Sequence, residues 1–134
     1  MFLGILNEKE AKNFLELANI AMLANGDEAK ESEKAILDTF KMELGMQDYT
    51  ITNKKLSDLV TAFQASTKKV KRAVIIELAG VLDVDQGIDE MENAWITKLG
   101  ADWNFRDSEI KKMVRWTQDF NDLIEEAYEY INKR

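Results

Sequence analysis

The sequence predicts an all-α fold, and three observations support this prediction. The 134 residues contain no proline and only six glycines, so the residues that most often break helices are scarce. Apolar residues recur at helical spacing in several segments, and no segment shows the sustained alternation of a β-strand. No linker-like or low-complexity stretch divides residues 1–134, and the length suits one domain. We therefore expect a single-domain helical bundle.

Two of the expected helices are apolar around nearly their whole circumference. The first covers residues 8–24 and follows Asn7, which forms a start resembling a capping box with Glu10. The second covers residues 66–82. A helix that is apolar on most of its sides is usually buried, so we expect these two helices to lie at the centre of the bundle.

The other helices are expected to be apolar on one side. The second helix along the chain ends at Leu44, before Gly45, which suits the left-handed position after a helix end. Thr52 is expected to cap a shorter third helix. A fifth helix, over residues 89–99, is expected to end at Gly100.

The last helix is expected to be the longest. Asp107 or Ser108 caps it, and apolar residues then continue at helical spacing as far as Ile131. About 24 residues at 1.5 Å each give a length of roughly 36 Å. We therefore expect this helix to pack across the whole domain.

The composition excludes several classes of function. The chain has no cysteine and no histidine, which removes thiol chemistry, the usual general base and the commonest ligands of zinc and copper. The net charge of −7 opposes binding to nucleic acid. Apolar runs such as residues 73–76 are too short to cross a bilayer, so we expect no membrane insertion and a cytoplasmic location.

One basic segment, residues 67–72, departs from this acidic balance. It places Lys68, Lys69, Lys71 and Arg72 in the first turns of a helix, where positive charge opposes the helix dipole. Two interpretations stay open. The segment binds an anion or an acidic partner, or it forms a solvated helix face on which Lys68 and Arg72 lie one turn apart.

The two central helices and the segments that follow them resemble each other. The triplet Glu-Leu-Ala that starts at Glu16 recurs at Glu77, and Glu33 of the next helix corresponds to Glu92. Each half therefore consists of a buried helix, an acidic loop with a glycine, and a glutamate near the start of the next helix. We expect an internal helix-loop-helix duplication whose two loops lie in related positions.

This pattern resembles the tellurite-resistance TerB-like family, which includes the TerB-like helical domain of some J-domain membrane co-chaperones. The family motif is an apolar helix ending in Ala-Asp-Gly, then a hydrophobic residue, then a glutamate that opens the next helix. Two segments carry a similar motif: residues 23–37, with Asn25, Gly26 and Glu33, and residues 82–96, with Asp85, Ile88 and Glu92. The resemblance implies an all-helical module with an acidic site, linked to tellurite and other chemical stress and to divalent-metal binding.

The acidic residues of both loops are candidate ligands for a hard cation, Ca²⁺ or Mg²⁺. Residues 83–94 do not form an EF-hand, because Gly87, Ile88 and Ala94 occupy positions that require a ligand, a glycine and a glutamate. A looser site stays open, since Asp89 and Glu92 share one helix face. The candidate metal ligands are Asp83, Asp85, Asp89 and Glu92 of the second loop, with Asp27 and Glu33 of the first.

The same carboxylates also have a purely structural interpretation. Asp85 or Asp89 can cap the fifth helix, and Glu92 lies in its first turn, where a carboxylate accepts backbone N–H bonds and complements the helix dipole. Neither role needs a metal ion.

Three functions follow from these interpretations. The first is a non-enzymatic TerB-like module that binds a divalent cation and a protein partner. The second is a metal-free protein–protein interaction or scaffold domain. The third is an acidic metal-dependent hydrolase, which requires facing carboxylates in a cavity and a basic residue for phosphate. The sequence shows no such constellation, so we expect no catalytic residues.

Overall fold

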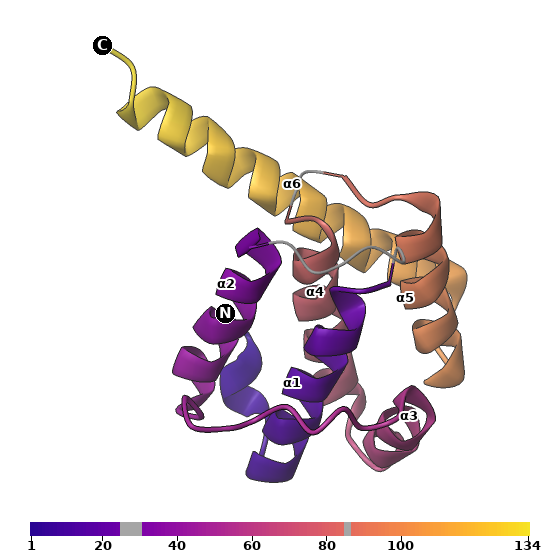
Figure 1. Cartoon of the computed structure of the whole chain (residues 1–134). Coiled ribbons are helices and arrows are strands. Elements are labelled where there is room, and N and C mark those ends of the chain that lie inside the picture. Colours follow the sequence, from indigo (N-terminus) through magenta and orange to yellow (C-terminus); the bar gives the residue numbers. More distant parts are fainter. Residues whose placement is uncertain (25–30, 85–86) are drawn as a thin grey trace.

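The computed structural model describes residues 1–24, 31–84 and 87–134, with residues 31–33 described by their backbone alone. This part of the chain forms a 3-10 turn, six α-helices and no strand (Figure 1). The elements are η1 (Leu3–Ile5), α1 (Glu8–Ala21), α2 (Glu31–Leu44), α3 (Leu56–Gln64), α4 (Lys68–Leu82), α5 (Glu90–Asp102) and α6 (Asp107–Ile131). The prediction of an all-α bundle is confirmed.

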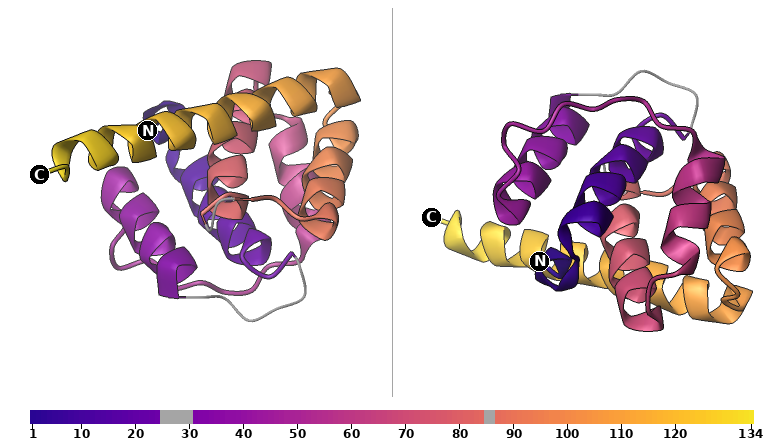
Figure 2. Two further views of the ribbon diagram at one scale, coloured as in Figure 1. Left: turned by 90° about the horizontal axis from the view of Figure 1, so that it is seen from above. Right: turned by 90° about the horizontal axis from the view of Figure 1, so that it is seen from below.

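The helices α1 and α4 lie at the centre of the bundle, as their apolar sequences predict. α1 contacts α2, α3 and α4, whereas α4 contacts α1, α5, α6 and η1 (Figure 2). Each central helix buries side chains on several sides, among them Phe14, Leu15 and Leu17 of α1 and Val74, Ile75 and Leu78 of α4. Each also buries the glutamate of its repeated triplet, Glu16 in α1 and Glu77 in α4.

Local signals determine where the central helices begin. The Asn7 side chain accepts a hydrogen bond from the Glu10 N–H at 2.8 Å, and the Glu10 carboxylate accepts one from the Asn7 N–H at 2.9 Å. This is the predicted capping box of α1. At the start of α4, the Thr67 hydroxyl accepts a bond from the Val70 N–H at 3.2 Å.

Three predicted boundaries are wrong. Thr52 does not cap α3, because its N–H and its hydroxyl both donate to the Glu16 carboxylate. α5 does not end at Gly100 but continues to Asp102. Gly100 instead lets α5 approach α6 closely, because a Cβ at this position would overlap the Ile110 side chain.

The third wrong boundary is the start of α6. Neither Asp107 nor Ser108 is the cap, because the helix already begins at Asp107 and its N-cap residue is Arg106. The Glu109 carboxylate accepts a hydrogen bond from the Arg106 N–H at 3.1 Å and so satisfies one free donor of the helix start.

The long helix α6 packs on the bundle over only part of its length. Its 25 residues extend about 37 Å, and its C-terminal part passes beyond the other helices (Figures 1 and 2). Thr117 donates to the Ile76 carbonyl at 3.4 Å, and the Asn121 amide donates to Asp83 at 2.9 Å. Every residue from Asp122 onward is exposed, so the prediction that α6 packs across the whole domain is only half correct. None of the described helices is long and apolar enough to cross a membrane.

Candidate functional site

Two of the candidate metal ligands form the cap of α5. Asp89 is the N-cap residue, and its carboxylate accepts a hydrogen bond from the Glu92 N–H at 2.8 Å. The Glu92 carboxylate accepts one from the Asp89 N–H at 3.0 Å. These two bonds make a complete capping box. The structural interpretation left Asp85 and Asp89 open as the cap, and the structure shows that Asp89 is the cap.

A third candidate, Asp83, connects two helices. It lies directly after α4 and is 5% exposed. Its carboxylate accepts a hydrogen bond from the Asn121 side chain of α6 at 2.9 Å. Asp83 therefore holds α6 at the point where this helix leaves the bundle.

The remaining candidates are not placed. Asp27 and Asp85 lie outside the described residues, and for Glu33 only the backbone is described. Within the described part of the chain, no three acidic side chains come together as a group that could hold a metal ion. The structure thus brings Asp89 and Glu92 together, and it pairs Asp83 with an amide of α6. The proposed cation site across the two loops stays a prediction.

Two of the four basic residues in the segment 67–72, Lys68 and Lys71, donate hydrogen bonds to backbone carbonyls of neighbouring elements. The Lys68 ammonium donates to the Trp103 carbonyl at 3.1 Å and lies 4.0 Å from the centre of the Phe105 ring. Lys71 is 7% exposed and donates to the Gln64 carbonyl at 3.2 Å. Both acceptors lie at helix C-termini, where a positive charge is favourable. Lys71 is therefore not part of a solvated face, whereas Lys68 is exposed as that interpretation expects. Anion binding by this segment stays a prediction.

A buried carboxylate that the site prediction did not include is Glu16 of α1. It is 1% exposed and accepts hydrogen bonds from the Tyr49 hydroxyl at 2.5 Å and from the N–H groups of Thr52 and Lys54 at 2.9 and 3.1 Å. These bonds attach the connector between α2 and α3 to α1. The sequence feature that indicates this buried carboxylate is a glutamate within a helix that is otherwise apolar on nearly all sides.

The protonation states of this cluster follow from its contacts. Burial raises the pKa of Glu16, but the hydrogen bonds from Tyr49, Thr52 and Lys54 outweigh burial and hold the pKa below its ordinary value of 4.5. Burial and the neighbouring carboxylate raise the pKa of the Tyr49 hydroxyl above 10.0. At neutral pH the cluster is therefore a carboxylate surrounded by donors, which is an arrangement that stabilises the connector.

The surface is hollowed beside the N-terminal residues. A groove of about 440 Å³ lies between these residues and the first turns of α4. Apolar side chains and two basic ones line it: Met1, Phe2, Ile5, Ala73 and Ile76, with Lys69 and Arg72. Two exposed residues of the basic segment, Lys69 and Arg72, thus border an apolar surface.

A second groove of about 290 Å³ continues from the first toward α6. We call it the aromatic groove, and its lining residues are Phe2, Ile76, Lys112, Met113 and Trp116. The Phe2 and Trp116 rings lie 5.9 Å apart between their centres, and Trp116 stacks on Phe120 at 5.3 Å. An aromatic row therefore follows α6 along the surface.

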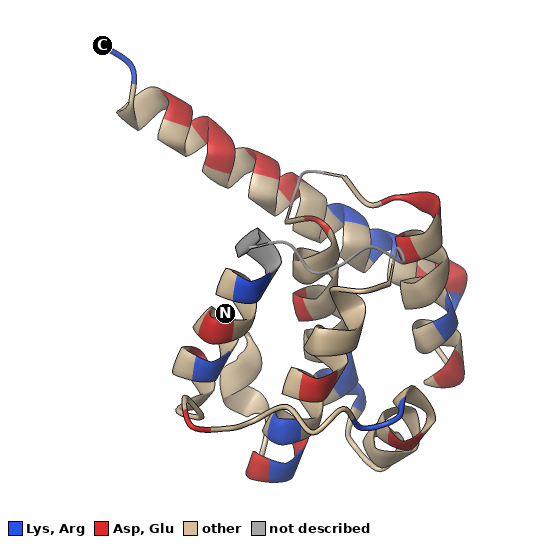
Figure 3. Ribbon diagram, in the orientation of Figure 1, with Lys and Arg blue, Asp and Glu red and all other residues tan. Residues whose placement is uncertain are grey.

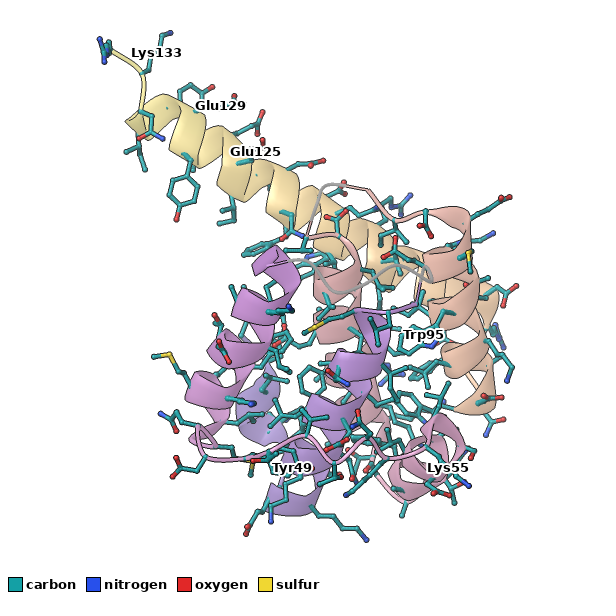
Figure 4. All side chains as sticks on the ribbon, viewed as in Figure 1. Tyr49, Lys55, Trp95, Glu125, Glu129 and Lys133 are labelled. Carbon is teal, nitrogen blue, oxygen red and sulfur yellow. The ribbon has the colours of Figure 1, made fainter. Side chains whose placement is uncertain are left out.

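The row leads to the projecting half of α6, which we define as residues 122–131. Four of its ten residues are acidic and lie on one helix face, and six are apolar or aromatic. The acidic residues are Asp122, Glu125, Glu126 and Glu129, and the others are Leu123, Ile124, Ala127, Tyr128, Tyr130 and Ile131. Figure 4 labels Glu125 and Glu129 on this half of the helix, and Glu125 lines a hollow that Ile36 of α2 and Gly80 of α4 also line.

The apolar residues of this half are strongly exposed. Leu123 is 62% exposed, Tyr130 76% and Ile131 74%. Scattered apolar residues on a surface are normal, but a contiguous apolar face next to an aromatic groove is typical of an interaction site.

The chain matches no protein-family model, no curated protein and no solved structure in the comparisons.

Proposed function

We propose that the chain is a non-enzymatic protein-interaction module that docks through α6. The observation that carries this proposal is the projecting half of α6, an amphipathic helical segment whose apolar face is uncovered by the described residues. The aromatic groove adjoins it and extends the same apolar surface onto the bundle.

The energetics of a short helix support this proposal. Ten residues alone do not form a stable helix in water, because most helical stability in proteins comes from packing of an apolar face. The projecting half is helical as the continuation of the packed half, which Thr117 and Asn121 hold to α4 and to the residue after it. A protein that covers the apolar face supplies the packing that the projecting half lacks.

The cation-binding hypothesis remains a separate prediction. Asp83, Asp89 and Glu92 have structural hydrogen bonds, and a cation would have to compete with them. The resemblance to the TerB-like family, and its link to tellurite and chemical stress, likewise stay predictions. The interaction proposal does not depend on either.

Site-specific photo-crosslinking in the cells of the source organism tests the proposal. A benzophenone-bearing amino acid in place of Tyr130 is expected to give discrete protein adducts. The same amino acid in place of Lys98, whose side chain is 80% exposed on α5, is the matched control and is expected to give none. The adducts should disappear with Leu123→Glu, which places a charge on the apolar face, and persist with Asp122→Glu. Equal labelling at both positions would refute the proposal.

A further inference from the structure

The groove beside the N-terminal residues and the aromatic groove share two lining residues, Phe2 and Ile76, so they form one continuous hollow. We infer that this hollow binds a free fatty acid, which is a carboxylate joined to an unbranched apolar chain. The carboxylate contacts Lys69 and Arg72, and the apolar chain follows the hollow toward Trp116. This ligand goes beyond the proposed function and does not depend on it, because the projecting half of α6 takes no part in the site.

The side-chain charges that border the hollow are positive, although the net charge of the chain is −7. Lys69, Arg72 and Lys112 line the hollow, and no acidic residue is among the described residues that do. The hollow that Asp83 and Glu125 line has the opposite character. An anion is therefore favoured beside the N-terminal residues, in contrast to most of this acidic surface.

Lys69 and Arg72 suit a carboxylate. They lie three residues apart on one face of α4, and both are exposed. Neither forms an ion pair with another described residue. An arginine guanidinium can bind a carboxylate through two parallel hydrogen bonds, and the lysine adds a second positive charge. Positive charge in the first turns of a helix is unfavourable by itself, and a bound carboxylate would relieve this repulsion.

The rest of the hollow suits an unbranched apolar chain. Its apolar lining includes Phe2, Ile5, Ala73, Ile76, Met113 and Trp116. Phe2 is 38% exposed and Trp116 45%, so a bound chain would remove apolar surface of the protein, as well as its own, from water. The part next to the two cations has a volume of about 440 Å³, and ligand sites typically have about 300–1,000 Å³.

Other occupants match only part of this hollow. A neutral apolar ligand would leave Lys69 and Arg72 without a partner, and a small polar anion would leave the apolar walls in water. An anionic membrane would also meet the projecting half of α6, whose acidic residues Figure 3 shows in red, and would repel it. An acidic protein segment shares the two features of a fatty acid, and the experiment distinguishes the two.

Calorimetric titration of the purified chain with dodecanoate, below the concentration at which it forms micelles, provides the main experiment. One molecule is expected to bind per chain. From octanoate to decanoate to dodecanoate, the affinity is expected to rise by up to about fourfold per methylene, because each methylene leaves water. Dodecanol has the same chain without the charge and is expected to bind at least about tenfold more weakly.

Two outcomes of this titration would overturn the inference. Equal affinity for dodecanoate and dodecanol would show that the cations do not select the ligand. No binding of dodecanoate would exclude a fatty acid and leave the hollow to an acidic protein segment.

Substitution of the two cations tests where the carboxylate binds. Lys69→Gln with Arg72→Gln is expected to weaken dodecanoate at least about tenfold and to remove the preference over dodecanol. Lys98→Gln with Lys111→Gln is the matched control, because it removes the same charge from exposed positions outside the hollow and is expected to change neither result. Circular dichroism checks that both variants stay folded. Equal losses in the two double variants would indicate attraction by net charge alone and would overturn the site.

Fluorescence quenching tests where the apolar chain lies. Dodecanoate with a bromine atom on its last carbon quenches tryptophans that it touches, so it is expected to quench Trp116. Trp116→Phe keeps an apolar ring in the aromatic groove and is expected to bind the brominated ligand with little quenching. Trp95→Phe is the matched control and is expected to retain the quenching. Equal quenching in both variants would overturn the proposed path of the chain.

Vesicles of phosphatidylglycerol distinguish a free fatty acid from an anionic membrane, because both combine negative charge with apolar chains. The wild-type chain is expected to remain in solution when the vesicles are sedimented. Adsorption to the vesicles that Lys69→Gln with Arg72→Gln abolishes would show that the hollow binds a membrane surface, and would overturn the inference of a free ligand.

Discussion

The substitution Glu16→Gln measures how strongly the connector between α2 and α3 is held to α1. Glutamine keeps the size of the side chain, removes its charge, and turns an N–H donor toward one of the donors that face Glu16. Hydrogen bonds to a charged acceptor contribute about 1.5–3 kcal/mol, and those between neutral groups about 0.5–1.5 kcal/mol. Thr52 and Lys54 are exposed, so water partly replaces the lost bonds. We therefore expect the free energy of unfolding to fall by about 2 kcal/mol.

The pH dependence of this loss identifies its cause. The pKa of Glu16 is lower in the folded chain than its ordinary value of 4.5. The contribution of the carboxylate is therefore fully present above the unfolded pKa and is lost as the pH falls through the folded pKa. The difference in unfolding free energy between the wild type and Glu16→Gln is expected to be constant near pH 7 and to shrink below pH 4.5.

Urea unfolding, followed by circular dichroism at several pH values, provides the measurement. Tyr49→Phe is the control, because it removes one hydrogen bond and leaves the carboxylate charged. It is expected to cost about 1 kcal/mol and to retain the loss of stability in acid. A Glu16→Gln variant as stable as the wild type at pH 7 would refute this account of the connector. A difference that persists unchanged in acid would also refute it.

Two further predictions concern glycines and cations. Gly80→Ala is expected to stabilise the chain by up to about 1 kcal/mol, because Gly80 lies inside a helix and a Cβ there meets no atom of the described residues within 4 Å. Gly100→Ala is expected to destabilise the chain despite the same gain in helix propensity, because the new Cβ overlaps the buried Ile110 side chain. Thermal melting compares the two glycine variants with the wild type. If the acidic loops bind a cation, Ca²⁺ or Mg²⁺ should raise the melting temperature relative to chelator, and Asp89→Asn with Glu92→Gln should abolish the rise. Identical melting of the wild type with Ca²⁺, Mg²⁺ and chelator would remove the cation hypothesis.

The features that the sequence predicts correctly depend on residues close together in the chain. The capping box of α1 joins residues three positions apart, so the pattern contains both partners. For α5 the pattern left Asp85 and Asp89 open as the cap, and the structure shows Asp89. The burial of α1 and α4 follows from their composition alone. The cluster around Glu16 was missed because its donors lie 33 to 38 residues away, and no local pattern marks them.

Other features were missed because the sequence does not show which surfaces meet. Lys68 and Lys71 bond to backbone carbonyls, a group that every residue has, so no side-chain pattern identifies the acceptors. The periodicity of α6 is the same for Ile110, which is buried, and for Ile131, which is 74% exposed. Helical spacing shows that an apolar face exists but not how much of that face the rest of the chain covers.

The hydrogen bond between Asp83 and Asn121 lies at the base of the projecting half and joins α6 to the end of α4. The ten residues beyond Asn121 extend about 15 Å, so a tilt of α6 by about 10° would move their far end by roughly 3 Å. Asp83 directly follows α4, where the second acidic loop begins. A displacement of Asp83 would therefore act on α6 where the helix leaves the bundle, and the length of the projecting half would enlarge that displacement at its far end.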